Sequence, residues 1–173
     1  MILKRRKLPQ VGKQELEGGE HTPETEEYGI SSFVFRSQKP FHPECFWNYL
    51  NDNHPSGVIR SKGLFWLFSR PNNAINFGKA GGSSRVEKAV VCWASLSYKE
   101  RTNYQSFADN QQYIESKWDK KWGDRMNELV FIVQDLEKDK MISELEGCLL
   151  NEREESIYAA SNNGFRDPFP KEI

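Results

Sequence analysis

His42, Glu44 and Cys45 form the one local cluster of side chains in this sequence that has the chemistry to bind a metal ion. Imidazole nitrogen, thiolate sulfur and carboxylate oxygen are all zinc ligands. Pro43 lies inside the cluster, and proline suits the first turn of a helix because its missing N–H has no partner there. The cluster therefore has two interpretations: a metal site, or an ordinary helix start with a buried cysteine.

Two further polar clusters have side chains that could bind a partner. The segment Arg60-Ser61-Lys62-Gly63 is expected between two strands, where its two cations could meet a carboxylate or a phosphate. In Gly123-Asp124-Arg125, the aspartate could accept hydrogen bonds from the backbone amides of a turn, and Arg125 could pair with Glu128. Each cluster is either a turn with a salt bridge or an interface with a partner domain. The residues predicted for that interface are Arg60, Lys62, Gly63, Gly123, Asp124 and Arg125.

The patterns that phosphate binding and structural zinc require do not occur in the sequence. A phosphate-binding loop needs G-x-x-x-x-G-K-[ST], but Lys79 is followed by Ala80, and Asn73 stands where the first glycine belongs. The three cysteines are widely spaced and odd in number, which predicts no disulfide framework and no zinc-ligand pair. No histidine lies in a context that indicates a nucleophile and its base. We therefore predict no enzymatic activity and no cofactor bound by this chain alone.

Apolar periodicity indicates the elements that must position these clusters. Phe33 and Phe35 alternate with polar residues after Ile30, as in a strand. A helix is predicted from Pro43 to about residue 51, and a second one carries an apolar stripe and follows Asp135, its expected N-cap. Further strands are predicted at 58–61, 64–68, 74–79, 85–94 and 129–133, and a polar, partly helical segment at 98–121. The unbroken apolar character of 64–68 suggests an interior strand that is covered on both faces.

These elements predict an α+β fold in the order β-α-β-β-β-β-x-β-α. The expected architecture is a mainly antiparallel sheet of about five to six strands with two helices packed on one face. Residues 1–28 are predicted to be a flexible arm or interdomain linker, because apolar residues are too sparse there to offset the entropy of ordering. The domain is expected to span 29–155, followed by an irregular tail at 156–173.

Composition narrows the possible partners and compartment. A formal net charge of -1 gives no field that would favour nucleic acid or an anionic membrane. No apolar run approaches the roughly 20 residues that span a bilayer. The basic residues near Met1 have no apolar stretch behind them, so they are not typical of a secretory signal. The reducing cytoplasm is the expected compartment.

A series of short segments resembles the CobW C-terminal domain. It begins with the run from His21 to Phe33 and ends with Asp167-Pro168-Phe169-Pro170. Between them, matching segments occur in the same order: Pro40-Phe41-His42-Pro43-Glu44, Val58-Ile59-Arg60-Ser61-Lys62-Gly63, Phe65-Trp66-Leu67, Ala80-Gly81-Gly82, Trp93-Ala94, Gly123-Asp124-Arg125 and Glu128-Leu129-Val130-Phe131-Ile132. The matches extend over about residues 21 to 170, which makes the resemblance specific.

The resemblance implies an accessory domain of a GTPase-dependent metallochaperone. In the complete family protein, a GTPase domain binds GTP and carries a Cys-x-Cys-Cys metal motif, and none of that domain occurs in this sequence. The implied role is a non-catalytic interaction or regulatory domain in metal homeostasis, with zinc or cobalt as the implied cargo. Its implied partners are a CobW-type GTPase domain and a metalloprotein client, not nucleic acid or membrane.

An RNA-binding α+β module is the alternative. Sheets that bind RNA present aromatic side chains for stacking on bases, next to basic residues. Phe33, Phe35 and Trp66, with Arg36, Arg60 and Lys62, could form such a surface.

Overall fold

The structure is a computed structural model that describes residues 28–160 and 165–172. The predicted arm at 1–28 lies outside these residues except for its last position. The strands are β1 (Ile30–Ser37), β2 (Val58–Phe65), β3 (Asn73–Ala80), β4 (Ser83–Val91) and β5 (Asn127–Gln134). The helices are α2 (Pro43–Asn51), the 3-10 turn η1 (Trp93–Ser95), α3 (Tyr98–Arg101), α4 (Gln105–Ala108), α5 (Gln111–Ser116), α6 (Lys138–Gly147) and α7 (Glu152–Ala160).

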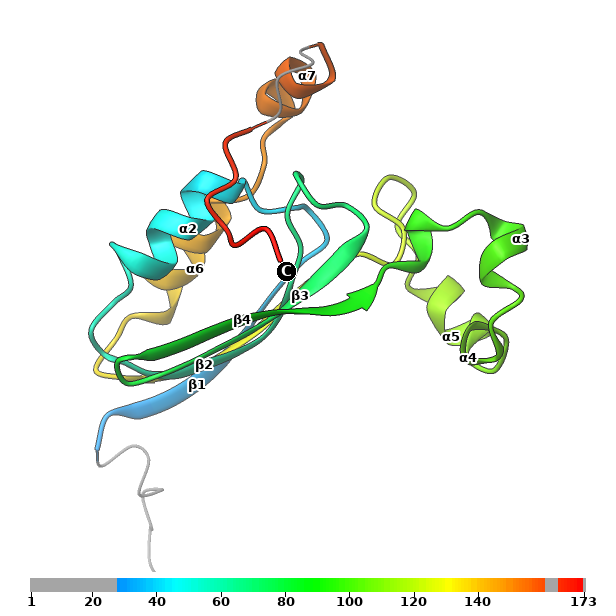
Figure 1. Cartoon of the computed structure of the whole chain (residues 1–173). Helices are drawn as coiled ribbons and strands as arrows, with labels where there is room; N and C mark the ends of the chain where they lie inside the picture. The colour runs from blue at the N-terminus through cyan, green and yellow to red at the C-terminus, as the bar shows by residue number, and fades with distance from the viewer. Residues whose placement is uncertain (1–27, 161–164, 173) are drawn as a thin grey trace, which may run out of the picture.

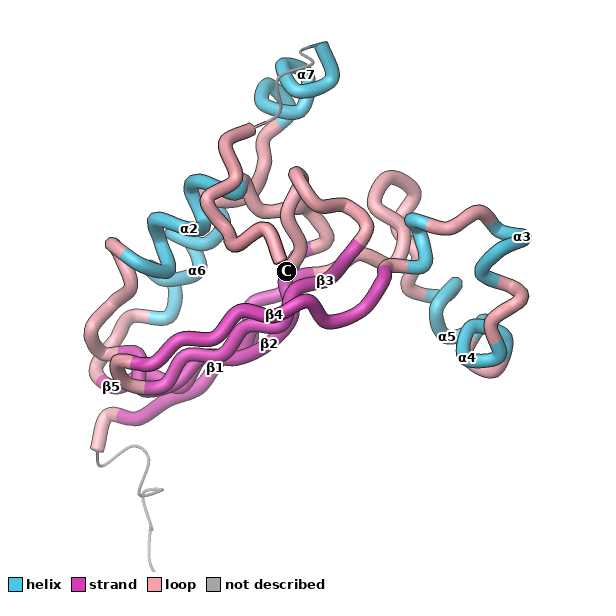
Figure 2. The backbone as a smooth tube through the Cα atoms, viewed as in Figure 1, coloured by secondary structure: helices cyan, strands magenta, loops and turns pink. Residues whose placement is uncertain are grey.

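The five strands form one sheet (Figure 2) in the order β1-β5-β2-β3-β4. Every neighbouring pair in this sheet is antiparallel. Strand β5 therefore lies in the interior of the sheet, although it is the last strand in the sequence. Hairpins connect β2 to β3 and β3 to β4, and the tight turn at Gly81-Gly82 joins the second pair. The predicted α+β class and the mainly antiparallel sheet are confirmed.

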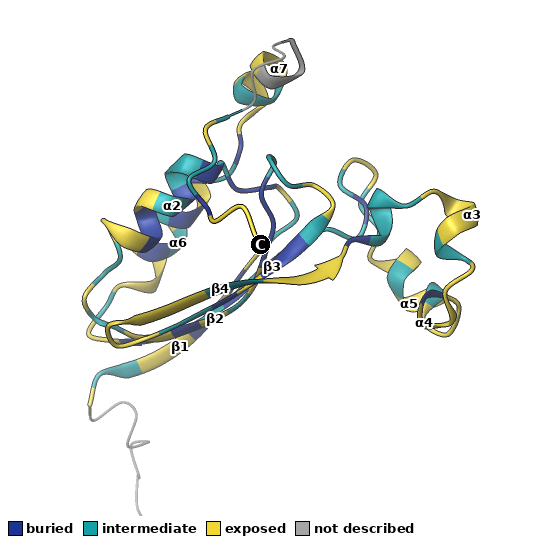
Figure 3. Ribbon diagram, in the orientation of Figure 1, coloured by how far each residue is buried: buried dark blue, intermediate teal, exposed yellow. Residues whose placement is uncertain are grey.

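Helices α2 and α6 cover one face of this sheet (Figure 1). The core lies between them and the sheet, and Figure 3 shows its buried residues along the strands and the inner sides of the two helices. Aromatic rings fill much of it: the rings of Phe41 and Phe46 stack 3.8 Å apart, and Phe33 stacks on Phe131 at 5.1 Å. Contacts between aromatic rings add to the stabilisation that burial provides.

Strand β2 corrects the prediction of two separate strands at 58–61 and 64–68. A single strand runs from Val58 to Phe65, and Trp66 and Leu67 follow it outside the ladder. Gly63 was interpreted as part of a break, yet its backbone (φ 149°) lies within the strand, where any Cβ would be 2.0 Å from the carbonyl oxygen of Glu128. Glycine thus allows β2 to approach β5 closely instead of ending the strand. The predicted cover on both faces is also wrong, because Leu64 is exposed.

The polar segment at 98–121 is partly helical, as predicted, and forms a satellite cluster of the short helices α3, α4 and α5 beside the sheet (Figure 1). Phe107 is fully buried in this cluster and packs edge-on against Trp93, with 5.2 Å between the ring centroids. The guanidinium of Arg101 lies 4.4 Å from the Trp118 ring centroid, a cation–π distance. A second, smaller core therefore organises these helices.

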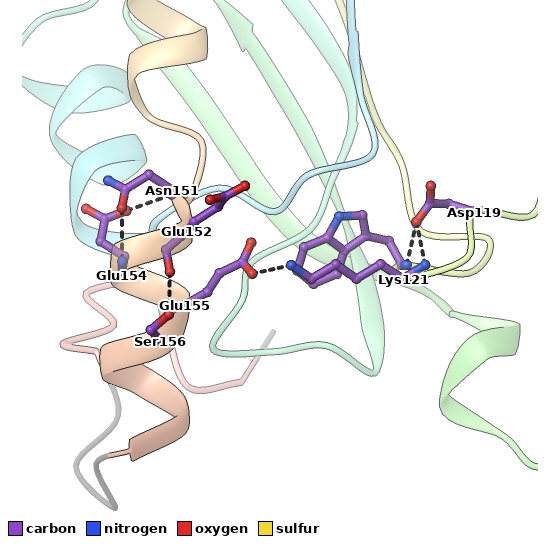
Figure 4. A network of polar contacts seen from close by, with 8 residues as sticks. Asp119, Lys121, Asn151, Glu152, Glu154, Glu155 and Ser156 are labelled. Carbon is purple, nitrogen blue, oxygen red and sulfur yellow. Dashed lines mark hydrogen bonds and ion pairs between the residues drawn. The ribbon is translucent and has the colours of Figure 1, made fainter.

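The C-terminal part differs from the predicted irregular tail after residue 155. Helix α7 continues to Ala160, because a reciprocal pair of hydrogen bonds between Asn151 and Glu154 caps its first turn at 2.9 and 3.0 Å (Figure 4). An ion pair between Lys121 and Glu155 ties this helix to the end of the satellite cluster (Figure 4). Phe169, which follows, is buried against Trp47 and Phe65, so the last described segment docks onto the core.

Two local predictions near α6 are wrong. Asp135 does not cap the helix: it has φ 51° and its N–H donates to the carbonyl of Gly29 at 3.0 Å, while α6 begins three residues later with Glu137 as N-cap. The expectation of no disulfide is also overturned, because Cys45 and Cys148 are bonded across 103 residues of sequence. The packing of α2 against α6 brings them together, and spacing along the chain contains no sign of that.

Candidate interaction surface

The face of the sheet opposite α2 and α6 carries no described helix, and we call it the open face. Alternation along β2 places Ser61 and Phe65 on the covered side, where both are fully buried, and Arg60, Lys62 and Leu64 on the other. The strand register brings further residues onto the same face as this group: Val34 and Arg36 from β1, Glu128, Val130 and Ile132 from β5, Asn76 and Gly78 from β3, and Arg85 and Glu87 from β4.

Arg60 and Lys62 are the two cations of the open face that have no anionic partner among the described residues. Arg60 lies between Ile132 and Ala80 in the ladder, and Lys62 lies between Val130 and Gly78, so no carboxylate is directly opposite either one. The other two cations are paired: Arg36 donates to Glu128 at 2.8 Å, and Arg85 contacts Glu87. The predicted location of Arg60 and Lys62 between two strands is wrong, but their place in the centre of β2 sets both on one exposed face.

Apolar side chains surround these two cations. Leu64 and Val34 are each 37% exposed, and Val130 and Ile132 are partly buried next to them. At the far end of β4, Val90 and Val91 are more than half exposed. Exposed apolar side chains gathered on one face, with an arginine among them, are typical of a protein–protein contact surface.

The Gly123-Asp124-Arg125 cluster connects the satellite helices to the sheet. Both carboxylate oxygens of Asp124 accept backbone hydrogen bonds, from Trp93 and Ala94, at 2.8 Å each. Asp124 thus bonds to backbone amides, as predicted, but these amides lie about thirty residues away. Gly123 has φ 69°, and any Cβ there would be 2.3 Å from the Cβ of Ala94. The segment that leads into the satellite cluster, at Trp93 and Ala94, is therefore held close to the segment that leaves it, at Gly123 and Asp124.

Arg125 does not pair with Glu128, which corrects the predicted ion pair. Its Nε donates to the carbonyl of Pro71 at 2.6 Å, its Nη1 donates to the carbonyl of Trp122 at 3.0 Å, and its guanidinium lies 5.5 Å from the Trp66 ring centroid. Glu128 instead accepts a hydrogen bond from Arg36. The contacts of Arg125 are internal, and so are those of Gly63, Gly123 and Asp124. For these four residues a contact with a partner stays a prediction.

A groove extends the open face toward α5. Two adjoining hollows of about 680 and 450 Å³ share a lining of Trp93, Tyr113, Lys117, Asp124, Met126 and Glu128. Tyr113 is 62% exposed at its edge, and its hydroxyl accepts a 2.6 Å hydrogen bond from the ammonium of Lys117. Of these lining residues, sequence reasoning singled out Asp124 and Glu128 but missed the groove and the contribution of Tyr113, Lys117 and Met126. The signal available was a set of aromatics in a polar segment, which gives no indication of which side faces the sheet.

The three side chains predicted to form a metal cluster each contact a different partner instead. The Nδ1 of His42 accepts from the N–H of Cys45 at 3.3 Å, so His42 caps α2. Glu44 pairs with Arg166 at 3.2 Å, and Cys45 is bonded to Cys148. Within residues 28–160 and 165–172, no group of three or more His, Cys, Asp or Glu side chains is arranged to hold a metal ion. The geometry agrees with the helix-start interpretation.

The aromatics of the RNA alternative do not form a stacking surface. Phe33 and Phe35 face α2 and α6, and Trp66 is buried as well, with its indole N–H bonded to the carbonyl of Gln38 at 3.2 Å. Bases cannot stack on rings that are enclosed by the core. No described helix is long and apolar enough to cross a bilayer.

A comparison with known protein families matches most of the described residues. A family model described as the cobalamin synthesis protein cobW C-terminal domain matches residues 30–149. Over 139 residues, the chain is 36% identical to zinc-regulated GTPase metalloprotein activator 1 of Dictyostelium discoideum, an alignment that covers 79% of this chain and 28% of that protein. It is 26% identical over 140 residues to a zinc chaperone of Mycobacterium tuberculosis, covering 81% of this chain and 34% of that one.

Among solved structures, the Zn(II)-bound YjiA GTPase from E. coli matches with a TM-score of 0.48 and 14% identity. That match covers 78% of this chain and 34% of the other. The chain thus spans about a third or less of the length of each of these proteins.

Proposed function

The chain belongs to the family of cobalamin synthesis protein CobW C-terminal domains, and from this we propose that it is a non-catalytic interaction domain of a CobW-type, GTPase-dependent metallochaperone. In this proposal a GTPase domain binds GTP and the divalent metal, zinc or cobalt, and the present chain contacts that domain and a metalloprotein client. The names of two relatives, a zinc-regulated GTPase metalloprotein activator and a zinc chaperone, support this assignment. The cytoplasm is the proposed compartment.

The open face carries the proposal. Arg60 and Lys62 project from the centre of the sheet with no anionic partner among the described residues, next to the exposed Leu64 and Val34. A cation that is left unpaired on an apolar surface gains most when a partner carboxylate approaches it and water is excluded. The proposed occupant is therefore an acidic, partly apolar surface of the GTPase domain. In these relatives, which are roughly two and a half to three times as long, such a surface can be supplied by the rest of the same polypeptide.

The test is a binding titration of the 173-residue chain against the separately expressed GTPase domain of the Dictyostelium relative. Isothermal titration would be run with that domain nucleotide-free, GDP-bound and bound to a non-hydrolysable GTP analogue, each with and without zinc. We expect association in at least one state. The double variant Arg60→Glu/Lys62→Glu should weaken it at least tenfold, which corresponds to about 1.4 kcal/mol.

A charge reversal on the opposite side serves as the matched control. Lys138 and Lys140 are exposed on α6, which covers the other face, so Lys138→Glu/Lys140→Glu changes the net charge equally without touching the open face. This control should bind within twofold of the unmodified chain. Absence of association in every nucleotide state, or equal losses in both double variants, would remove the proposed docking surface.

A further inference from the structure

Cys45 and Cys148 join the two helices that cover the sheet. Cys45 lies in the first turn of α2, and Cys148 is the C-cap of α6. Their Cα atoms are 5.3 Å apart, which is within the usual range for a disulfide. The N–H of His42 donates to the carbonyl of Cys148 at 2.8 Å, so the backbone holds the two ends together independently of the sulfur atoms. The same geometry can therefore accommodate two thiols or one disulfide.

The two sulfur atoms differ in exposure. Both cysteines line an open surface hollow of about 610 Å³, together with Asn48, Tyr49, Asn53, Glu144 and Gly147. Cys148 is almost fully buried, whereas Cys45 is partly exposed. A small thiol or disulfide therefore reaches Cys45 first. Exposed disulfides are the ones that exchange readily with solution thiols.

The two helices also differ in the charge that they present. Cys45 lies at the positive end of the nine-residue helix α2, which stabilises a thiolate, whereas Cys148 lies at the negative end of α6. Cys92, the third cysteine, is buried elsewhere, and its burial, together with Asp124, raises the pKa of its thiol to about 11. Cys45 is thus the attacking residue, Cys148 the resolving residue, and Cys92 a bystander.

We propose that Cys45 and Cys148 form a reversible dithiol–disulfide site that reacts with small disulfides of the glutathione type. The thiolate of Cys45 attacks one sulfur of oxidised glutathione, forming a mixed disulfide and releasing one glutathione thiolate. The thiolate of Cys148 then attacks Cys45 Sγ, which forms the Cys45–Cys148 bond and releases the second glutathione. Two electrons pass from the cysteines to the oxidant, and the two departing thiolates take up the two protons that the cysteines lose.

Oxidation would link α2 covalently to the end of α6 without altering the open face. The bond closes a loop across 103 residues, and such a link stabilises a fold mainly by restricting its unfolded chain. The melting temperature of the oxidised chain should therefore exceed that of the reduced chain by roughly 5–15 °C.

Alkylation of the whole chain tests the site. The reduced protein should take three iodoacetamide adducts when denatured, one for each cysteine. After incubation with oxidised glutathione it should take one, on Cys92, and peptide mapping should show Cys45 linked to Cys148. Reduction by glutathione should restore three adducts and lower the melting temperature. The Cys92→Ser variant should behave the same way with one adduct fewer.

Cys45→Ser provides the decisive comparison because serine is close to cysteine in size and the Cys45 side chain is only partly buried. It should form no intramolecular link, and its melting temperature should not change between oxidised and reduced buffers. Three adducts after oxidation, a stable mixed disulfide that Cys148 never resolves, or an equal melting shift in Cys45→Ser would each overturn the proposal.

Discussion

Arg60, Lys62 and Arg125 are all cations, but they differ in what holds them. Arg125 donates two hydrogen bonds to backbone carbonyls and lies over Trp66, whereas Arg60 and Lys62 have no anionic partner among the described residues. A charged donor that bonds to carbonyls of the fold, one of them partly buried, contributes to folding, while an unpaired exposed cation contributes little. At the residue scale, then, Arg60 and Lys62 are available to a partner, whereas Arg125 is held by contacts within the fold.

This difference predicts unequal effects of alanine substitution. Arg125→Ala should lower the free energy of unfolding by about 1–2 kcal/mol, because the partly buried carbonyl of Trp122 loses its donor and the contact with the Trp66 ring is lost. Arg60→Ala and Lys62→Ala should each change it by no more than about 0.5 kcal/mol. Urea denaturation of the three variants measures this. A loss at Arg60 as large as that at Arg125 would show that Arg60 is structural.

His54 makes stability depend on pH. Both of its ring nitrogens are buried without a hydrogen-bond partner among the described residues. Burial, and secondarily the charge of Lys79, lowers the pKa of His54 from 6.5 to about 4. Between these values the unfolded chain binds a proton that the folded chain does not. Stability from this residue is therefore complete above about pH 6.5 and is lost as the pH falls toward 4.

We expect the unfolding free energy of the unmodified chain to fall by roughly 1–3 kcal/mol more between pH 6.5 and 4 than that of His54→Gln, which cannot titrate. Urea denaturation across this range measures the difference, and carboxylate effects cancel because both chains share them. Parallel curves for the two proteins would contradict this account.

At the scale of elements, the satellite cluster of α3, α4 and α5 depends on how its ends are attached. It leaves the sheet after β4 and returns before β5, and Asp124 bonds the entry at Trp93 and Ala94. The cluster forms one wall of the groove through Tyr113 and Lys117. The carboxylate of Asp124 therefore helps to fix the position of the cluster relative to the open face.

Asp124→Ala should detach this cluster from the sheet. Two backbone N–H groups would lose a charged acceptor, so the unfolding free energy should drop by about 2–4 kcal/mol. Amide hydrogen exchange should accelerate in residues 93–122 more than in β1 and β5. Asp109→Ala is the matched control, because Asp109 is exposed and its carboxylate bonds only to Gln105 in its own helix. Equal exchange patterns in both variants would contradict the role of Asp124 in attaching the cluster to the sheet.

At the scale of the whole molecule, the last described segment closes the fold. Asp167 accepts hydrogen bonds from Ser69 and Arg70, both at 2.7 Å, and Arg70 also donates to the carbonyls of Phe169 and Pro170. These contacts place the Phe169 ring between α2 and the sheet, where it packs against Trp47 and Phe65. The end of the domain is therefore part of its core.

Phe169→Ala should destabilise the whole domain by about 3–4 kcal/mol, as large-to-small changes in a core do. The loss should appear as one cooperative transition in calorimetry, because the ring contacts the shared core. Ile157→Ala is the control, since Ile157 is exposed on α7 and should change stability by no more than about 0.5 kcal/mol. A Phe169→Ala variant as stable as this control would show that the segment is dispensable.

Local periodicity was enough to identify most elements and the α+β class. Alternation at Phe33 and Phe35 located β1, and the apolar stripe at Phe46 and Leu50 located α2, because the side-chain period of a strand or helix is a local property of the chain. The pair of cations at Arg60 and Lys62 was also visible, since both residues lie two apart on what proved to be one strand. Membership of the CobW family was recognisable from ordered short segments that span most of the domain.

Tertiary structure alone decided which of those residues are free. The insertion of β5 between β1 and β2 gives Glu128 to Arg36 and leaves Arg60 and Lys62 without an anion opposite them. Packing of α2 on α6 brings Cys45 to Cys148, and the return of the chain after α5 brings Asp124 to Trp93. Each of these contacts joins residues about 30 to 100 positions apart, and a pairing at that distance depends on how strands and helices assemble, which local sequence patterns do not encode.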